Sequence, residues 1–275
     1  MEKEFGLGTC YCKEKLSHMK KLLLVCLLLI AAIIGFAQTE ENAPSLSADR
    51  PGMATGPDVT PFLKVVWETG FESYFTDEPG ILLPTTMVRF GVTRFAELRL
   101  EYDGVLNRYG SHKWGYDVQP LVVGTKVKIF EGYKWVPKIA MMANLSIPLV
   151  RHIDADSNIQ RVAPSLYLLF QNDVTDWFNI GYNVGVEWSG YSPIPTAFLA
   201  LCLGFNITDD FGAFIESYNY FTHLGKRNTE VECNLDFGFS YAVHPRVQLD
   251  LYGMFNCQNP KAFNGIGLGV AWLIN

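Results

Sequence analysis

The sequence predicts an all-β fold: a transmembrane, antiparallel, up-and-down β-barrel of about 12 strands, preceded by a signal peptide. Three observations lead to this prediction. A secretory leader stands near the start of the chain, and short segments after residue 40 alternate apolar and polar residues with a period of two, as β-strands do. The connections between those segments are alternately short and long along the chain, which is typical of outer-membrane barrels.

Composition limits the class of protein. Of the 275 residues, 49% are hydrophobic and 14% aromatic, so the chain has enough apolar surface to be ordered. The charged fraction is 18%, below the usual quarter for soluble domains. From Gln38 onward the chain has 17 basic and 25 acidic residues, a formal net charge of −8. A nucleic-acid binder needs a basic face, so we expect no nucleic-acid partner.

The leader lies at residues 19–38. Lys20 and Lys21 precede a 13-residue apolar core at residues 22–34, and small residues stand just before Gln38. This is the pattern of a cleaved signal peptide, and a core of this length is too short for a membrane anchor, which needs about 20 residues. We therefore expect translation to start at Met19. The domains follow as residues 1–37, the signal peptide; 38–60, a periplasmic N-terminal segment; and 61–275, the barrel.

Twelve strands are expected along the barrel region, each bounded by turn-forming residues. They are residues 61–74, 81–92, 94–104, 117–130, 134–149, 159–173, 176–189, 196–207, 210–221, 228–242, 246–257 and 264–274. Short turns follow the even-numbered strands, and longer polar connections follow the odd-numbered ones, at residues 75–80, 106–115, 150–158, 190–195, 222–228 and 257–264. Outer-membrane barrels have tight periplasmic turns and longer external loops. This predicts the cell outer membrane of a diderm bacterium, with the N-terminus periplasmic.

The stretch FAELRLEYDG at residues 95–104 raises the question of which face points outward. In a soluble sandwich the apolar face would point inward, whereas in an outer-membrane barrel it faces lipid. The polar faces of the later strands are rich in glycine and asparagine, which suits a lumen better than an outer surface. We therefore expect Leu98 and Leu100 to face lipid. Aromatic residues beside the short turns predict an interfacial girdle: Phe95, Trp135, Trp177, Phe211 and Trp272.

Several stretches resemble one family of outer-membrane barrels, the transporters associated with the meta-pathway of phenol degradation. They are Asp49-Arg50-Pro51, residues 68–72 (ETGFE), residues 89–93 (RFGVT) leading into residues 97–100 (ELRL), and residues 214–218 (FIESY). The resemblance spans nearly all of the chain after the leader. It implies an outer-membrane barrel and the passage of small hydrophobic or aromatic compounds. The C-terminus departs from the family, because it ends in Asn275 where the assembly signal often has phenylalanine.

Residues that could carry chemistry are few. We predict no catalytic, cofactor-binding or metal-binding residues, because the histidines lie in loops or a turn without Cys, Asp or Glu at ligand spacing. Residues 154–158 (DADSN) could hold Ca²⁺, although a solvated loop is favoured. Three cysteines remain after the leader, too few for a disulfide framework. Cys233 and Cys257 are expected to be diagonal neighbours, an arrangement that does not favour a disulfide.

The inward face of the predicted barrel carries most of the charge. The lumen-lining residues, predicted as the transport path, are Lys64, Glu68, Glu72, Arg89, Glu97, Arg99, Glu101, Asp103, Lys126, Lys128, Lys138, Arg161, Glu216, Glu230, Glu232, Asp236 and Asp250, and Lys134 and Glu187 share their inward parity. The basic residues gather on strands four to six and the acidic ones on strands nine to eleven. Either these charges pair and fill the barrel, or they set up a transverse field across an open channel.

The first functional hypothesis is a passive channel or transporter for small solutes, without a cofactor and without enzymatic activity. Its partners would be outer-membrane lipid, the barrel-assembly machinery and the solute. The alternative is a non-conducting structural or partner-binding barrel. A third reading, a soluble lipid-binding barrel, would need about eight strands and an apolar interior.

Overall fold

A computed structural model describes residues 46–75, 79–109, 113–152, 158–223, 229–258 and 263–274. The predicted signal peptide at residues 1–37, the proposed start at Met19 and most of the Ca²⁺ candidate at residues 154–158 lie outside these residues. No helix in the described part of the chain is long and apolar enough to cross a membrane.

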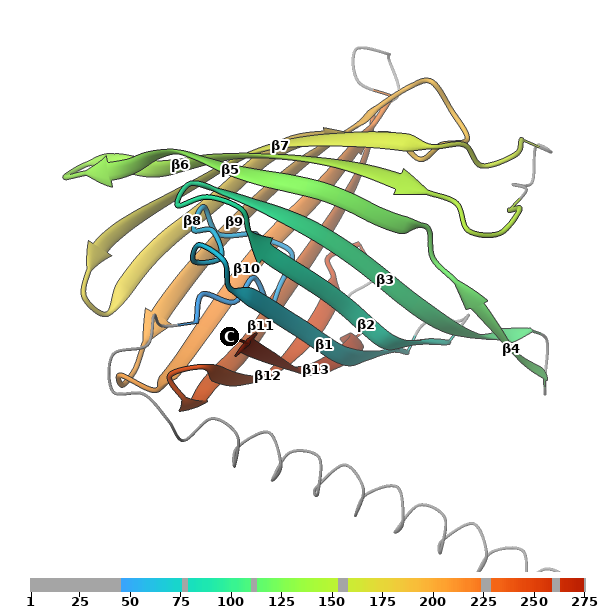
Figure 1. Ribbon diagram of the computed structural model, residues 1–275. Coiled ribbons are helices and arrows are strands. Elements are labelled where there is room, and N and C mark those ends of the chain that lie inside the picture. Colours follow the sequence, from blue (N-terminus) through green and yellow to red (C-terminus); the bar gives the residue numbers. More distant parts are fainter. Residues whose placement is uncertain are drawn as a thin grey trace, which may run out of the picture. The chain divides into compact units, whose positions relative to one another are not determined.

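The described chain forms β-strands almost throughout its length (Figure 1). The strands are β1 (Val65–Tyr74), β2 (Gly80–Gly91), β3 (Ala96–Tyr109), β4 (Lys113–Val118), β5 (Leu121–Tyr133), β6 (Val136–Ile147), β7 (Ala163–Thr175), β8 (Phe178–Glu187), β9 (Thr196–Asn206), β10 (Phe211–Thr222), β11 (Glu230–His244), β12 (Val247–Asn256) and β13 (Phe263–Ile274).

The strands make one closed antiparallel barrel. Each strand from β5 to β13 pairs with its neighbour in sequence, β13 pairs with β1, and β1 pairs with β2. The ring closes because β3 pairs with β2 on one side and with β5 on the other. The short β4 pairs only with the outer part of β3, so β4 and β5 share one place in the ring. The barrel therefore has the predicted 12 strand places.

The sequence-based prediction was wrong about the fourth strand of the barrel. We expected one strand at residues 117–130 after a long loop at residues 106–115, but β3 continues to Tyr109 and β4 already begins at Lys113. The break falls instead at Gln119 and Pro120, between β4 and β5. Proline has no N–H to donate to a strand ladder, so the pairing stops there and resumes at Leu121.

The connections differ at the two ends of the barrel. At one end, here called the short-turn end, the strands are joined by residues 92–95, 134–135, 176–177, 207–210 and 245–246. At the other, the long-loop end, lie most of the longer connections, among them residues 148–162 and 188–195. This segregation by length agrees with the sequence analysis.

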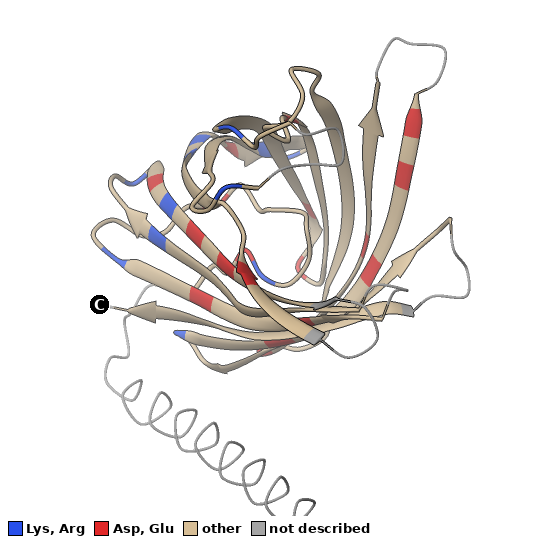
Figure 2. Ribbon diagram, turned by 90° about the vertical axis from the view of Figure 1, so that its right-hand side faces the viewer, with Lys and Arg blue, Asp and Glu red and all other residues tan. Residues whose placement is uncertain are grey.

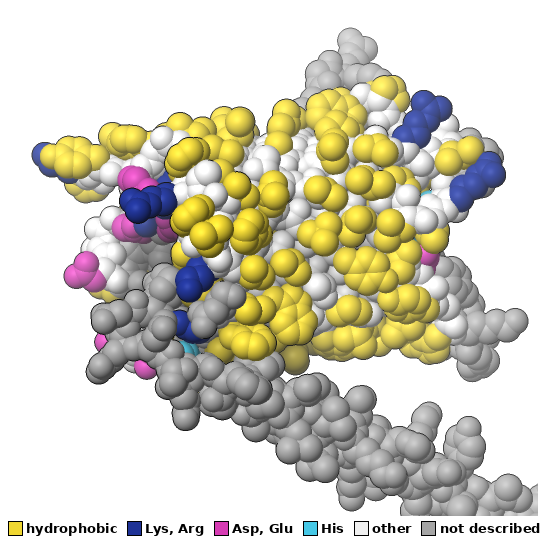
Figure 3. Space-filling model, viewed as in Figure 1, with side chains coloured by type: hydrophobic (Ala, Val, Ile, Leu, Met, Phe, Trp, Pro, Cys, Tyr) yellow, Lys and Arg dark blue, Asp and Glu magenta, His cyan; other side chains and the backbone are white. Residues whose placement is uncertain are grey.

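The outer surface of the barrel is apolar. Leu98 and Leu100 are 53% and 44% exposed, whereas their neighbours Glu97 and Arg99 are 0% and 4% exposed. The same alternation runs through the other strands, and Figure 3 shows hydrophobic side chains covering the middle of the visible face, with charged ones near its ends. Trp135 and Trp177 are exposed beside the short turns, as expected for an interfacial girdle. The predicted inside-out pattern is confirmed.

Residues 46–64, here called the N-terminal segment, run inside the barrel (Figures 1 and 2). Strand β1 was expected to begin at residue 61 but begins at Val65, because the preceding residues bridge to the end of β2. Leu63 donates to the carbonyl of Gly91, and Gly91 donates to the carbonyl of Lys64. Gly91 has no side chain, and a Cβ there would overlap the carbonyl of Pro61.

The pairing of β11 and β12 corrects the expected geometry of two cysteines. We expected Cys233 and Cys257 to be diagonal neighbours, but Asn234 pairs with Asn256, which places the two cysteines directly opposite each other. The Cys257 N–H donates to the Cys233 carbonyl at 2.9 Å. Both are free thiols, and their Sγ atoms lie 2.8 Å apart.

Substitution of Leu100 by arginine tests the lipid-facing assignment. Arginine on the lipid face should destabilise the barrel by about 2–4 kcal/mol near the bilayer midplane. Heat-modifiable gel mobility of the refolded protein reports the loss of folding. Glu101→Gln, on the inward face of the same strand, is the matched control and should fold normally. Normal folding of Leu100→Arg would contradict the assignment of Leu100 to the lipid face.

Mild oxidation should link Cys233 to Cys257. Directly opposite, hydrogen-bonded residues on antiparallel strands have Cα atoms about 5.5 Å apart, inside the range that a disulfide spans. Peptide mass mapping without reductant, after copper–phenanthroline treatment, should find the linked pair. Cys202 on β9 should remain a free thiol and serves as the internal control. Recovery of all three cysteines as free thiols would contradict the opposed geometry.

Candidate functional site in the barrel lumen

A network of buried charges fills the lumen toward the short-turn end. It is here called the inner network, and the barrel contributes Glu68 from β1, Arg89 from β2, Glu97 and Arg99 from β3, and Lys126 from β5. Strand alternation turns all five side chains inward, and each is at most 4% exposed. Buried charges are stable only when they are paired and hydrogen-bonded, so the network must balance within itself.

Asp49 of the N-terminal segment lies at the centre of the inner network. Its carboxylate accepts from Lys126 Nζ at 3.0 Å, lies 3.5 Å from Arg89 Nε and bonds to Arg99 Nη1. Burial alone would raise the pKa of Asp49, but the charges of Arg89, Lys126 and Arg99 outweigh it and lower the pKa well below its usual range. Asp49 therefore stays ionised and supplies the negative charge that the three cations need.

Glu68 and Glu97 complete the inner network. Arg89 donates to Glu68 Oε1 at 2.8 Å and to Glu97 Oε1 at 3.0 Å. Glu68 also accepts the backbone N–H groups of Asp49 and Arg50, at 3.1 and 3.0 Å. Glu97 Oε2 accepts the N–H of Thr60 at 2.6 Å. Two acids of the barrel wall thus hold both ends of the N-terminal segment.

Arg50 lies against the inner face of the barrel wall and bonds to strands β2 and β12. Its guanidinium donates twice to Asp250 on β12, both at 3.2 Å, and once to Thr85 on β2, also at 3.2 Å. Thr85 and Asp250 are the ends of a row of paired residues that crosses four strands. The two residues between them are both glycines, Gly70 on β1 and Gly269 on β13. A Cβ on Gly70 would lie 2.6 Å from Arg50 Nη2, so the glycines make the seat in which the guanidinium lies.

Glu216 on β10 binds the backbone of the N-terminal segment directly. Its carboxylate accepts from Met53 N–H at 2.8 Å and Ala54 N–H at 2.9 Å. The preceding Gly52 has a φ of 97°, a conformation that other residues rarely adopt. This turn makes successive N–H groups converge on one anion, as in other backbone anion sites.

The N-terminal segment continues around the wall from there. Thr55 and Asn183 on β8 exchange two hydrogen bonds, of 2.7 and 3.0 Å. Asp58 then pairs with Lys128 on β5 at 2.9 Å and with Lys138 on β6 at 3.4 Å. Burial would raise the pKa of Asp58, but the two lysines lower it below the usual value. The segment therefore contacts strands on every side of the lumen.

These contacts change the interpretation of the predicted charges. Lys126, Lys128 and Lys138 were expected either to face the acids of β10 to β12 across open water or to pair with them. They instead pair with Asp49 and Asp58, and Lys138 also pairs with Asp173 on β7 at 3.0 Å. Sequence reasoning missed these two aspartates as site residues. The only signal for them was Asp49 in the family-like stretch Asp49-Arg50-Pro51.

The remaining predicted lumen residues lie in different places. Glu72 accepts from Tyr74 and Tyr252, Glu101 pairs with Arg99, and Asp103 accepts the N–H of Thr86. Asp236 is buried, Glu187 and Lys64 are half-buried, and Glu230 and Glu232 are exposed near the long loops. Arg161 is exposed ahead of β7, and Lys134 is exposed in the turn after β5.

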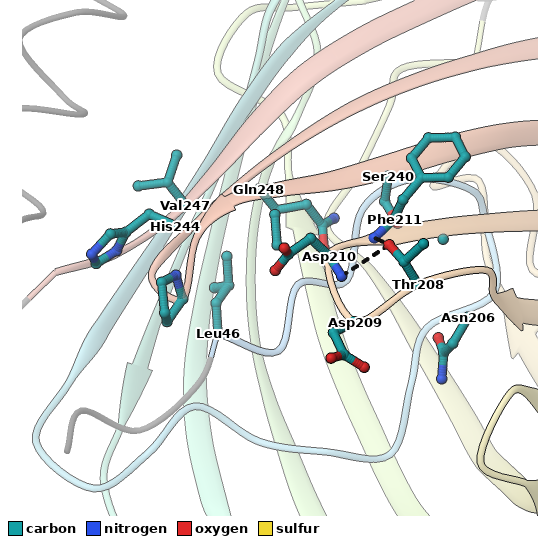
Figure 4. Close-up of a pocket in the computed structure, with 13 residues that line it drawn as sticks. Leu46, Asn206, Thr208, Asp209, Asp210, Phe211, Ser240, His244, Val247 and Gln248 are labelled. Carbon is teal, nitrogen blue, oxygen red and sulfur yellow. Dashed lines mark hydrogen bonds between the residues drawn. The ribbon is translucent and has the colours of Figure 1, made fainter. Parts of the chain in front are cut away.

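Two cavities open on the β9–β12 side of the barrel. The inner cavity, of about 380 Å³, lies at the short-turn end. Figure 4 shows Leu46 of the N-terminal segment on the side of His244, with Asp209 and Asp210 on the other side of the cavity. The outer cavity, of about 590 Å³, lies at the long-loop end and is lined by Tyr220, Thr222, Glu230, Val231, Glu232, Asn256 and Gln258. Both are lined mainly by polar and acidic residues of the wall opposite the lysines.

No group of His, Cys, Asp or Glu in the described residues could hold a metal ion. The described part of the lumen therefore offers paired charges and polar side chains rather than a metal centre. Such a lumen can bind and orient polar or charged solutes.

The chain is similar to a known family and to solved barrels. The model of a family described as "Putative MetA-pathway of phenol degradation" matches residues 48–272. The COG4313 outer membrane channel from Pseudomonas putida F1 has 10% sequence identity and a TM-score of 0.58, over 82% of this chain and 99% of that one. The NanC porin has 12% identity and a TM-score of 0.50, over 76% and 98%. A search of the curated proteins finds no match.

Replacing Asp49 by asparagine should destabilise the protein strongly. Removing one partner of a buried ion pair leaves an uncompensated charge and costs about 3–5 kcal/mol. Asp58→Asn is the control, because Asp58 is 33% exposed and its pairs should contribute only about 0.2–1 kcal/mol. Urea unfolding followed by tryptophan fluorescence measures both. Equal, small effects of the two substitutions would refute the central role of Asp49.

Proposed function

The chain belongs to this MetA-pathway family, and we propose that it is a passive outer-membrane channel for small solutes, hydrophobic or aromatic compounds among them. The transport of such compounds is what the family resemblance implies. The apolar outer surface suits lipid, and the polar lumen suits a water-filled path. The channel needs no cofactor and performs no chemical reaction on its solute.

The position of the two cavities carries this proposal. One opens at each end of the barrel, and both lie on the β9–β12 wall. The N-terminal segment pairs with the lysines on the opposite wall. We therefore assign the transport path to the part of the β9–β12 wall that lines these cavities. Arg89, Arg99 and Lys126 hold the segment on the opposite side. Glu216 and Asp250 also bind the segment, through Met53, Ala54 and Arg50.

The proposed orientation places the short-turn end in the periplasm and the long loops outside the cell, as in other outer-membrane barrels. Leu46 donates to the carbonyl of Pro245 in a short turn, so the N-terminal segment enters the barrel from this end. The residues before it would then lie in the periplasm. The partners of the protein would be outer-membrane lipid, the barrel-assembly machinery during folding, and the solute.

A second candidate function is a non-conducting structural barrel. The observation that favours it is the number of bonds between the N-terminal segment and the wall, from Glu68 around to Asn183 and back to Glu97. A segment held so firmly could close the lumen completely. The two functions differ in whether ions cross the barrel.

Conductance in planar lipid bilayers distinguishes these functions. The folded full mature chain should give small, discrete ion currents, because the N-terminal segment occupies only part of the lumen. Refolding is checked by heat-modifiable mobility. Absence of current from the folded protein would reject the channel and leave the structural barrel.

A further inference from the structure

Two free thiols face each other at the long-loop end of the barrel wall. Cys233 lies on β11, Cys257 directly follows β12, and the strand register places the two residues opposite each other. Their Sγ atoms lie 2.8 Å apart, and the Cys257 N–H donates to the Cys233 carbonyl at 2.9 Å. Opposed residues on antiparallel strands lie within the distance that a disulfide spans, so these two thiols can be linked without moving the strands.

The two thiols differ in exposure. Cys257 is exposed to solvent, whereas Cys233 is half-buried. An exposed thiol can attack a disulfide from solution, and a second thiol beside it can then displace the mixed disulfide that forms. Cys257 therefore fits the role of the attacking cysteine and Cys233 that of the resolving cysteine. Exposed disulfides are also the ones that are readily reduced again, unlike buried structural ones.

The residues around the two cysteines form most of the wall of the outer cavity. Five of the seven residues that line this cavity lie within three positions of Cys233 or Cys257: Glu230, Val231, Glu232, Asn256 and Gln258. Strand alternation turns Cys233 to the outer side of the wall, as it does Leu235, which is 40% exposed. A bond between the cysteines would therefore hold the cavity wall from outside and leave the cavity itself free.

The strand ladder between β11 and β12 ends next to the thiols. Its last pair is Asn234 with Asn256. Beyond this pair, the structure describes the backbone bond between Cys257 and Cys233 and a bond from the Gln258 side chain to the Val231 carbonyl, in place of a ladder. On its other side this end of β11 pairs with β10. Chain ends outside a regular ladder open locally more readily than the middle of a sheet.

We propose that Cys233 and Cys257 form a redox site that controls the shape of the outer cavity. The oxidant is a low-molecular-weight disulfide such as oxidised glutathione. The Cys257 thiolate attacks one of its sulfur atoms and releases one glutathione thiolate. The Cys233 thiolate then attacks the Cys257 sulfur and releases the second one. The two cysteine protons pass to the departing thiolates, so one disulfide forms in the protein as one is reduced in solution.

The disulfide joins β11 to the residue after β12 at the point where their ladder ends. It limits the separation of residues 230–232 from Gln258 and so keeps the outer cavity in one shape, whereas reduction allows this wall to open. This inference rests on the proposed function for its effect on transport, because the outer cavity is one end of the proposed path. The thiol chemistry itself does not require conduction.

Hydrogen exchange of the folded mature protein in detergent, measured by mass spectrometry, tests the site. The protein is equilibrated with oxidised or with reduced glutathione. The amides of residues 230–233 should exchange at least about tenfold more slowly in the oxidised form, because the cross-link opposes local opening. Cys257→Ser should abolish this difference. Cys202→Ser is the matched control, because Cys202 lies on β9, and it should keep the difference.

Three results would overturn the proposal. The first is equal exchange of the wild-type protein in the two buffers, and the second is a difference that persists in Cys257→Ser. The third is a Cys233–Cys257 disulfide that reduced glutathione does not open, since such a link would be permanent rather than switchable. Cys233→Ser should behave as Cys257→Ser does and replaces it if that variant does not fold.

Current recordings in the same two buffers separate this inference from the proposed function. Redox-dependent exchange without current would keep the redox site and reject the channel. Current with the same frequency of closures in both buffers would keep the channel and overturn the control of the cavity. Fewer closures in oxidised glutathione, with the difference lost in Cys257→Ser, would support both.

Discussion

The structure depends on the pairing of Asp49 with three cations of the barrel wall. Arg89, Arg99 and Lys126 project from neighbouring strands into a space that water does not reach, and two glutamates alone do not neutralise them. Asp49 supplies the missing charge from a part of the chain that is not a strand. Because buried charges must balance, the position of the N-terminal segment follows from the charges of the wall. That position also sets the other contacts of the segment, such as those of Met53 and Ala54 with Glu216.

The fold could be predicted from the sequence because each strand carries its own signal. Leu98 and Leu100 alternate with Glu97 and Arg99, and this pattern identifies both the strand and its two environments. Turn residues such as those at 207–210 then set the connections. The break at Pro120 was missed because Lys113 to Gly115 read as the end of a polar loop, and Asp117 and Val118 read as the start of the strand that continues to residue 130.

The site was predicted only in part, for a physical reason. The inward parity of Lys126 and Glu216 could be read from their strands, but their partners could not. Glu216 and Glu68 bind backbone N–H groups, which every residue except proline offers, so no side-chain pattern marks them in advance. Asn183 likewise binds the backbone of Thr55. Contacts of this kind depend on how the segment turns in three dimensions rather than on residue spacing.

The seat of Arg50 has a consequence for assembly. Strands β1 and β13 come from opposite ends of the barrel sequence, so their pairing closes the longest loop in the chain and carries the largest entropic cost. Arg50 lies over the two glycines that meet at this seam and bonds to Thr85 and Asp250 on the strands that flank it. Arg50 therefore connects the first hairpin, β1–β2, to the last, β12–β13. The residue that occupies part of the lumen thus also stabilises the β1–β13 pairing that closes the barrel.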